Sequence, residues 1–180
     1  PAGQADALGS QLANTEVEKV IAVENDDFAR HGIAAMVDAL AQIVETQKPS
    51  AVLIASSARG KEIAGRLAVR INSGVITDAV DLAADLGATQ SVFGGSFTVS
   101  SRVKIGTPVI TIRPSAIEPA TTSQTPTIEK VNVTISEKAK LVTISNTQPA
   151  VKGGRPELTE AKIVVSGGRG TNGDFTQVEA

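Results

Sequence analysis

The sequence predicts an α/β fold, namely a Rossmann-like three-layer α/β/α domain with a mainly parallel sheet. The first observation is that β-branched apolar runs alternate with segments of helical apolar spacing, in the order strand, helix, strand, helix, between residues 19 and 72. The second is the run at 51–55, which is apolar at every position, as in strands buried on both faces of a parallel sheet. Such strands are joined by right-handed helical crossovers, so the units form layers of helices and sheet.

Five elements are expected in the first half of the chain. Residues 2–12 form an Ala-rich helical stretch of the kind that follows a strand, so we expect the domain to lack its first strand. A strand at 19–24 is followed by three polar residues at 25–27, and a helix with apolar residues on one face is expected at 33–44. A buried strand at 51–55 then leads into a second amphipathic helix at 60–72.

Strands dominate the segments that follow. Residues 78–86 have a helical composition, but 89–95 and 97–99 are strand-like and are separated by a Gly-Gly break. We therefore favour strands with a bulged or hairpin connection in this region. A further strand is expected at 108–113, and the strict alternation at 131–135 predicts a strand with one solvated face.

A domain boundary is expected close to the end of the chain. A connector at 148–156 leads into an apolar strand at 160–165. Residues 1–156 are therefore predicted to form an N-terminal α/β domain. Residues 157–180 are predicted to be the opening strand and glycine-rich turn of a second, truncated domain.

Composition and charge exclude several classes of function. The 17 basic and 19 acidic residues are mixed along the chain and give a formal net charge of −2, without the basic stripe that binds nucleic acid. The absence of cysteine excludes disulfides, thiolate metal sites and cysteine nucleophiles. No segment approaches the roughly 20 apolar residues of a membrane-spanning helix.

The most informative motif is the sequence Ser-Gly-Gly-Arg-Gly at 166–170, here called the glycine-rich loop. It follows an apolar run at 161–165 and precedes a polar segment at 172–175, which is how many nucleotide-binding βα units begin. Without further context, a tight turn between strand and helix is the simpler interpretation, because glycines more often satisfy backbone geometry than bind ligands.

Several motifs together resemble the electron transfer flavoprotein alpha subunit family. The matching segments are 60–64 with 66–68, 77–82, 110–114 and, most specifically, 158–170. The resemblance implies an N-terminal α/β domain, the start of an FAD-binding domain and pairing with a beta subunit. It further implies an electron carrier and not an enzyme, which takes electrons from dehydrogenases and passes them to a quinone-linked acceptor. The implied compartment is the bacterial cytoplasm or the mitochondrial matrix, with no membrane insertion.

The resemblance also assigns cofactor-binding residues. Arg169 matches the arginine that contacts FAD in this family, and a guanidinium suits phosphate oxygens or a conjugated ring. The implied FAD-binding residues are Ser166, Gly167, Gly168, Arg169 and Gly170. One charged hydrogen bond contributes roughly 1.5–3 kcal/mol, whereas even millimolar binding needs about 4 kcal/mol. We therefore expect FAD to be bound by the complete protein and not retained by this fragment.

A phosphate-binding loop at 56–61 is the basis of the alternative function, an adenine-nucleotide-binding α/β module. This segment lies between a strand and the start of a helix, where phosphates often bind. It is not a Walker A loop, because the first glycine is missing and Glu62 follows the lysine. An ordinary helix entry is the favoured interpretation.

Two other candidates receive structural interpretations. His31 is the only histidine and has no second imidazole or cysteine with which to bind a metal, so a helix-entry or surface role is expected. Asp78, Asp81 and Asp85 would share one face of a helix but would divide between the faces of a strand. We therefore do not expect them to form a catalytic cluster.

Overall fold

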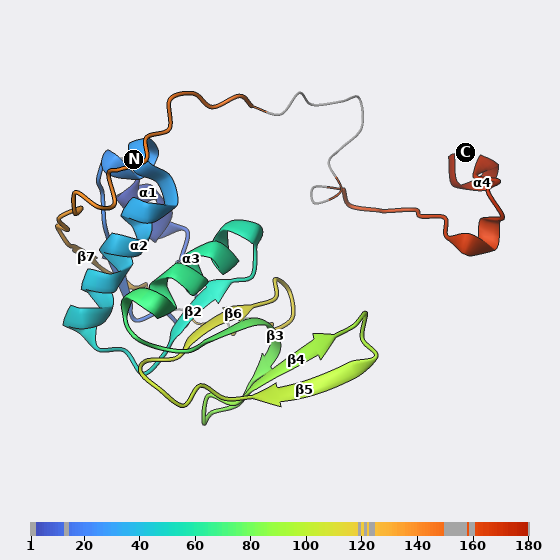
Figure 1. Ribbon diagram of the computed structural model, residues 1–180, viewed down its shortest axis with the longest axis horizontal. Coiled ribbons are helices and arrows are strands. Elements are labelled where there is room, and N and C mark those ends of the chain that lie inside the picture. The colour runs from blue at the N-terminus through green and yellow to red at the C-terminus, as the bar shows by residue number, and fades with distance from the viewer. Residues whose placement is uncertain are drawn as a thin grey trace. The chain divides into compact units, whose positions relative to one another are not determined.

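The computed structural model describes residues 3–12, 15–118, 120, 122, 125–149, 158 and 161–179. The chain divides into two compact units, Pro1–Ser145 and Asn146–Ala180 (Figure 1). Among the described residues, no helix combines the length and apolar content needed to cross a bilayer.

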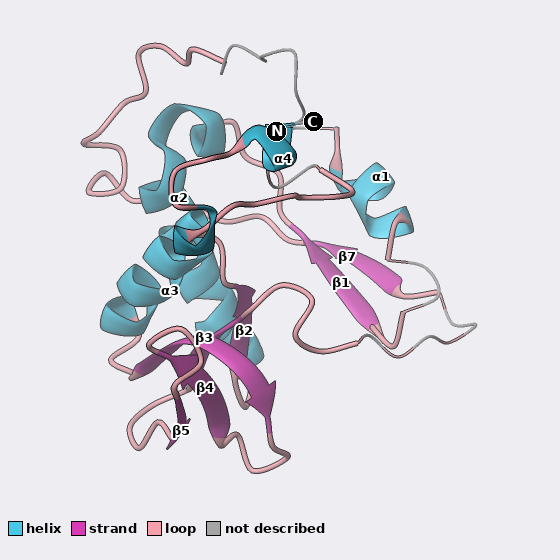
Figure 2. Cartoon of the chain, turned by 90° about the vertical axis from the view of Figure 1, so that its right-hand side faces the viewer, coloured by secondary structure: helices cyan, strands magenta, loops and turns pink. Residues whose placement is uncertain are grey.

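The described residues of the first unit form two sheets, which lie apart in Figure 2. The larger has the order β2-β6-β3-β4-β5, and the smaller pairs β1 with β7. The strands are β1 (Lys19–Ala22), β2 (Val52–Ala55), β3 (Val75–Leu82), β4 (Ala88–Val92), β5 (Phe97–Ser101), β6 (Val109–Ile112) and β7 (Thr127–Lys130). Pairing is parallel for β1 with β7, β2 with β6 and β3 with β6, whereas β3, β4 and β5 pair antiparallel. The predicted Rossmann-like α/β class with a mainly parallel sheet is confirmed.

The described part of the first unit has three helices: α1 (Ala5–Ser10), α2 (Asp27–Gln47) and α3 (Ala58–Arg70). Helix α2 begins before the predicted range and is kinked at Gly32, whose φ of 55° and ψ of −131° are not helical. Because φ is positive there, glycine is the residue that adopts this conformation without strain. The regular apolar spacing therefore marks only the part of α2 after the kink.

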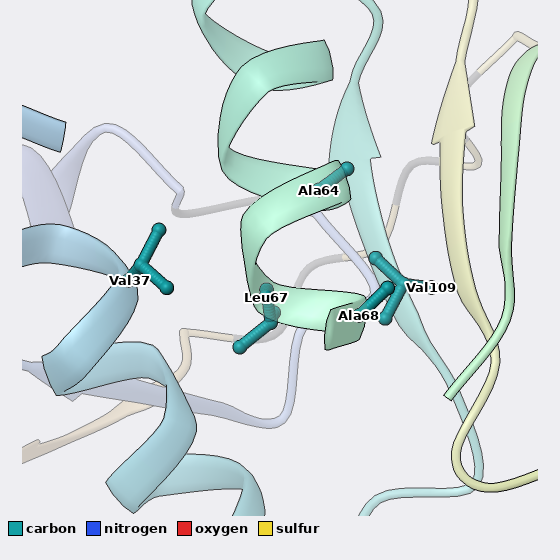
Figure 3. Packing of buried hydrophobic residues seen from close by; sticks show 5 residues of the cluster. All are labelled: Val37, Ala64, Leu67, Ala68 and Val109. Carbon is teal, nitrogen blue, oxygen red and sulfur yellow. The ribbon is translucent and has the colours of Figure 1, made fainter. Parts of the chain in front are cut away.

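The core lies between α2, α3 and the larger sheet. Val37 from α2, Leu67 from α3 and Val109 from β6 are buried together with Ala64 and Ala68. Figure 3 shows α3 between α2 and the strands, with Ala68 next to Val109. Alanines on the sheet side of α3 let the helix approach closely, while full burial of a side chain such as that of Leu67 contributes about 2 kcal/mol.

The segment predicted to mix helical and strand signals is confirmed as strand with a bulge. β3 shifts register against β4 between Ala79 and Asp81, and Asp78 has a φ of 62°. β4 and β5 form the hairpin across the Gly-Gly break. The bulge re-aims the strand side chains at this point, which places Asp78 among groups from other strands.

The predicted strand at 131–135 is wrong, because the strand in this region is β7. Beyond β7, the backbone N–H and C=O of Thr134 bond the side-chain amide of Gln42 at 3.2 and 2.7 Å. The N–H of Ser136 donates to the carboxylate of Asp38 at 2.6 Å. The alternation in the sequence reflects burial, since Ile135 packs against α2. The N–H of Val131 still donates to the carbonyl of Ala22 at the end of β1, at 2.9 Å, whereas the backbone bonds of Thr134 and Ser136 go to helix side chains.

The second unit contains a 3-10 turn, η1 (Arg169–Thr171), and one helical turn, α4 (Thr176–Glu179). The described residues 161–165 of the strand predicted at 160–165 form no sheet pairing, and residue 160 lies outside the described residues. Ile163, Val164 and Val165 are 82%, 55% and 67% exposed. A β-branched run alone does not make a strand, because the ladder needs a partner.

Candidate functional site

The glycine-rich loop enters η1 in the second unit. The N–H of Thr171 donates to the carbonyl of Gly168 at 3.1 Å, and its hydroxyl donates to the same oxygen at 2.9 Å. The N–H of Asn172 donates to the carbonyl of Arg169 at 3.2 Å, and Asn172 ends the turn with a φ of 50°. Local hydrogen bonds therefore define the backbone around Arg169.

The glycines of this loop have different surroundings. A Cβ atom on Gly167 would lie 2.9 Å from two ring atoms of Phe175 and 3.0 Å from the methyl of Thr171. A Cβ on Gly168 or Gly170 would meet nothing within 4 Å. A side chain at 167 would therefore make the ring of Phe175 shift, whereas the backbone at Gly168 and Gly170 has open space beside it.

Arg169 is exposed, and the part of the chain that the structure describes holds no ion pair to it. A guanidinium without a carboxylate partner is suited to phosphate oxygens, which it binds in a fork of two hydrogen bonds. Ser166, also exposed, adds a hydroxyl on the same loop. The five residues predicted for FAD binding therefore lie on one continuous loop, and their charge and open backbone fit a nucleotide cofactor.

A second polar group of residues lies in the first unit, where β2, β3 and β6 approach one another. We call it the Asp78 cluster; its members are Ser56, Lys61, Asp78, Thr111 and Arg113. Arg113 donates to Oδ2 of Asp78 through Nη2 at 2.7 Å and Nε at 3.2 Å. Ser56 donates to Oδ1 of Asp78 at 3.0 Å, and Nζ of Lys61 lies 3.7 Å from the same oxygen.

These donors lower the pKa of Asp78 below its ordinary value. The hydrogen bond from Arg113 is the largest cause, and burial acts in the opposite direction. Asp78 in turn raises the pKa of Arg113. The N–H of Asp78 donates to the hydroxyl of Thr111 at 2.8 Å, which holds the backbone of the bulge. The cluster therefore connects three strands through one ionised carboxylate.

The geometry favours an ordinary helix entry at 56–61 over a phosphate site. Ser57 caps α3 by accepting from the N–H of Gly60 at 3.0 Å. A Cβ on Gly60 would lie 1.9 Å from the carbonyl oxygen of Ala55, so this glycine permits close packing of α3 on β2. Lys61 faces the carboxylate of Asp78. A phosphate bound by Lys61 would be repelled by the carboxylate of Asp78, which already lies beside the ammonium group.

His31 has the structural role expected for it. Its Nδ1 lies 2.9 Å from the carbonyl oxygen of Val142, and since a carbonyl only accepts, Nδ1–H is the donor. Its Nε2 lies 3.8 Å from a carboxylate oxygen of Asp27, one turn earlier on α2. The first contact joins the start of α2 to the segment that follows β7, and the second lies within α2 itself.

The three aspartates do not act as a group. Asp78 pairs with Arg113, and Asp85 pairs with Arg102. The N–H of Gly87 is the largest cause that lowers the pKa of Asp85, followed by Arg102. Asp81 accepts the N–H of its neighbour, Leu82. Within the described residues, no three histidine or acidic side chains are arranged to hold a metal ion.

Sequence reasoning missed the partners of Asp78 and the contact of Phe175 with Gly167. The carboxyl ends of parallel strands meet at one edge of a sheet, which would have brought Ser56 and Arg113 together if the strand order had been known. Phe175 is an isolated aromatic residue in a polar segment, and that isolation was a usable signal.

The fold and the loop define a class, that of α/β proteins with a Rossmann-like domain and a glycine-rich loop. An electron transfer flavoprotein domain matches residues 1–136, and the chain belongs to this family. The recognition made from its motifs is confirmed.

Three of the similar proteins are named as alpha subunits. "Electron transfer flavoprotein subunit alpha" of Mycobacterium leprae is 42% identical over 183 aligned residues, covering 99% of this chain and 56% of the relative. The protein of the same name from Syntrophomonas wolfei is 35% identical, covering 93% of this chain and 54% of the relative. That from Bacillus subtilis is 27% identical, with 91% and 51% covered. The chain thus spans about half the length of the curated relatives it matches.

Proposed function

We propose that residues 1–156 are the N-terminal α/β domain of an electron transfer flavoprotein alpha subunit and that residues 157–180 begin its FAD-binding domain. The observation that carries this proposal is the glycine-rich loop, where open backbone at Gly168 and Gly170 flanks the exposed guanidinium of Arg169. The alignment with the Mycobacterium leprae protein covers 99% of this chain, which supports treating the loop as part of the same protein.

In the complete protein, FAD supplies the electron-transfer chemistry, and the polypeptide binds it and tunes its surroundings. Arg169 neutralises negative charge on the cofactor, and the N–H groups of the loop approach it closely because Gly168 and Gly170 carry no side chains. The first unit is the scaffold, since the core cluster between α2, α3 and the larger sheet is made of residues of that unit. The protein pairs with a beta subunit and carries electrons from dehydrogenases to a quinone-linked acceptor, in bacterial cytoplasm or the mitochondrial matrix. It acts as a carrier and not as an enzyme.

The test is an FAD titration of a longer version that reaches the length of the relatives, mixed with a candidate beta subunit. Arg169→Ala is expected to weaken FAD binding by about 10- to 100-fold, because a charged hydrogen bond contributes roughly 1.5–3 kcal/mol. Arg169→Lys retains the charge without the fork and is expected to fall in between. Arg66→Ala is the matched control, since among the described residues this exposed arginine pairs along its own helix with Glu62. Equal affinities for Arg169→Ala and the unchanged protein would contradict the proposal.

A further inference from the structure

We infer that Phe175 is a positioning residue for the FAD site, because its ring packs on Gly167 and fixes the loop that presents Arg169. The inference rests on the proposed function. It concerns a residue that acts through the loop and not through contact with the cofactor.

The contact between Phe175 and Gly167 brings together the two ends of a short segment, residues 167–175. A Cβ on Gly167 would lie 2.9 Å from both Cδ1 and Cε1 of the Phe175 ring, so the ring occupies the space that a side chain would need. Real Cβ atoms do not approach other atoms so closely, and one of the two groups would have to move. The absence of a side chain at 167 is therefore matched to the presence of an aromatic ring at 175.

The chain between these two residues is held by local hydrogen bonds. Thr171 donates twice to the carbonyl of Gly168, and Asn172 and Gly173 reverse the chain with φ values of 50° and 88°. The carboxylate of Asp174 accepts the N–H and the hydroxyl of Thr176 at 3.0 and 2.5 Å. These restraints direct the intervening residue, Phe175, back toward Gly167.

The carbonyl of Phe175 also begins α4. It accepts the N–H groups of Val178 and Glu179 at 2.8 and 3.0 Å. The residue that packs on the loop is thus the residue from which the helical turn starts, and the two structures are fixed together. An ordered loop is expected to bind a ligand more tightly than a mobile one, because less conformational entropy is lost on binding.

A double-mutant cycle tests this inference. In the longer version mixed with a candidate beta subunit, Phe175→Ala and Gly167→Ala are each expected to weaken FAD binding by about 3- to 10-fold, because the loop becomes less ordered. In the double variant the added methyl meets no ring, so the two effects are expected not to add. Phe175→Leu retains an apolar side chain and is expected to restore part of the affinity. Phe93→Ala is the matched control, since Phe93 is 81% exposed in the first unit.

A second measurement separates this inference from the proposed function. In the 180-residue chain without cofactor, Phe175→Ala is expected to move the amide resonances of Gly168, Arg169 and Gly170 and to increase their fast motion. Unchanged resonances, or additive losses of affinity in the cycle, would overturn the positioning role even if FAD binds. If the longer protein fails to bind FAD while the resonances respond as expected, the proposed function fails and the packing account stands.

Discussion

The internal strand β6 and the apolar run at 161–165 have similar sequences but different structures. β6 is bonded on both sides, by β2 and β3, and Val109, Ile110 and Thr111 have no exposed surface. Residues 161–165 have no strand partner among the described residues, and most of their apolar side chains are exposed. The comparison teaches that a β-branched run becomes a strand only where neighbouring strands bond its backbone and a helix covers its apolar side chains.

The largest expected effect in this comparison is on hydrogen exchange. In the 180-residue chain, the bonded amides of β6 are expected to exchange at least about 1,000-fold more slowly than those of Ile163, Val164 and Val165, because they open only with the core. Exchange monitored by NMR measures both sets in one sample. Equal protection of the two segments would show that the second unit has a partner for its apolar run.

A pair of glycines in α3 tests the close packing of the first unit. Gly60→Ala is expected to destabilise the chain by about 1–3 kcal/mol, since the new Cβ meets the carbonyl of Ala55. Gly65→Ala is the control in the same helix; its Cβ would meet nothing within 4 Å, and we expect a gain of about 0.5–1 kcal/mol from helix propensity. Urea unfolding measures both. A loss at Gly65 equal to that at Gly60 would contradict the packing explanation.

The Asp78 cluster predicts a smaller effect that depends on pH. Asp78→Asn is expected to cost about 1 kcal/mol near neutral pH, a modest value because the carboxylate is about a third exposed. The folded-state pKa of Asp78 lies below its unfolded value, so its contribution is present above about pH 4 and is lost as pH falls through the folded pKa.

Urea unfolding of Asp78→Asn and the unchanged chain, repeated from neutral to acid pH, checks this sign. The two stabilities are expected to converge in acid. Asp81→Asn is the control on the same strand, where the side chain accepts only a neighbouring N–H among the described contacts. A difference that grows as pH falls would contradict the assigned role of the carboxylate.

The helices and most strands could be predicted because their apolar spacing records burial directly. The strand predicted at 131–135 failed for a specific reason: Gln42 and Asp38 supply hydrogen bonds that a pattern of alternation does not distinguish from those of a sheet. The partners of Asp78 were missed because they depend on strand order, which places β6 between β2 and β3 against the order of the sequence.

In the glycine-rich loop, the sequence identified the residues, but the surroundings of each glycine became clear only from the structure. Its five residues stood out in the sequence by their motif, and the loop leads into the 3-10 turn that begins at Arg169. The different surroundings of Gly167 and Gly168 could not be predicted, because they depend on where the ring of Phe175 lies. The motif identifies the segment, whereas packing distinguishes the glycine that shapes the loop from those that leave it open.

The most direct test of the account is an FAD titration, followed by fluorescence, of two samples in parallel. One is the 180-residue chain, and the other is the longer version mixed with a candidate beta subunit. The account predicts binding by the longer pair and little or none by the chain alone, because a single loop with one arginine provides less than the about 4 kcal/mol of millimolar binding. Absence of binding by the longer pair would contradict the proposed flavin function, and tight binding by the 180-residue chain would contradict the scaffold role given to it.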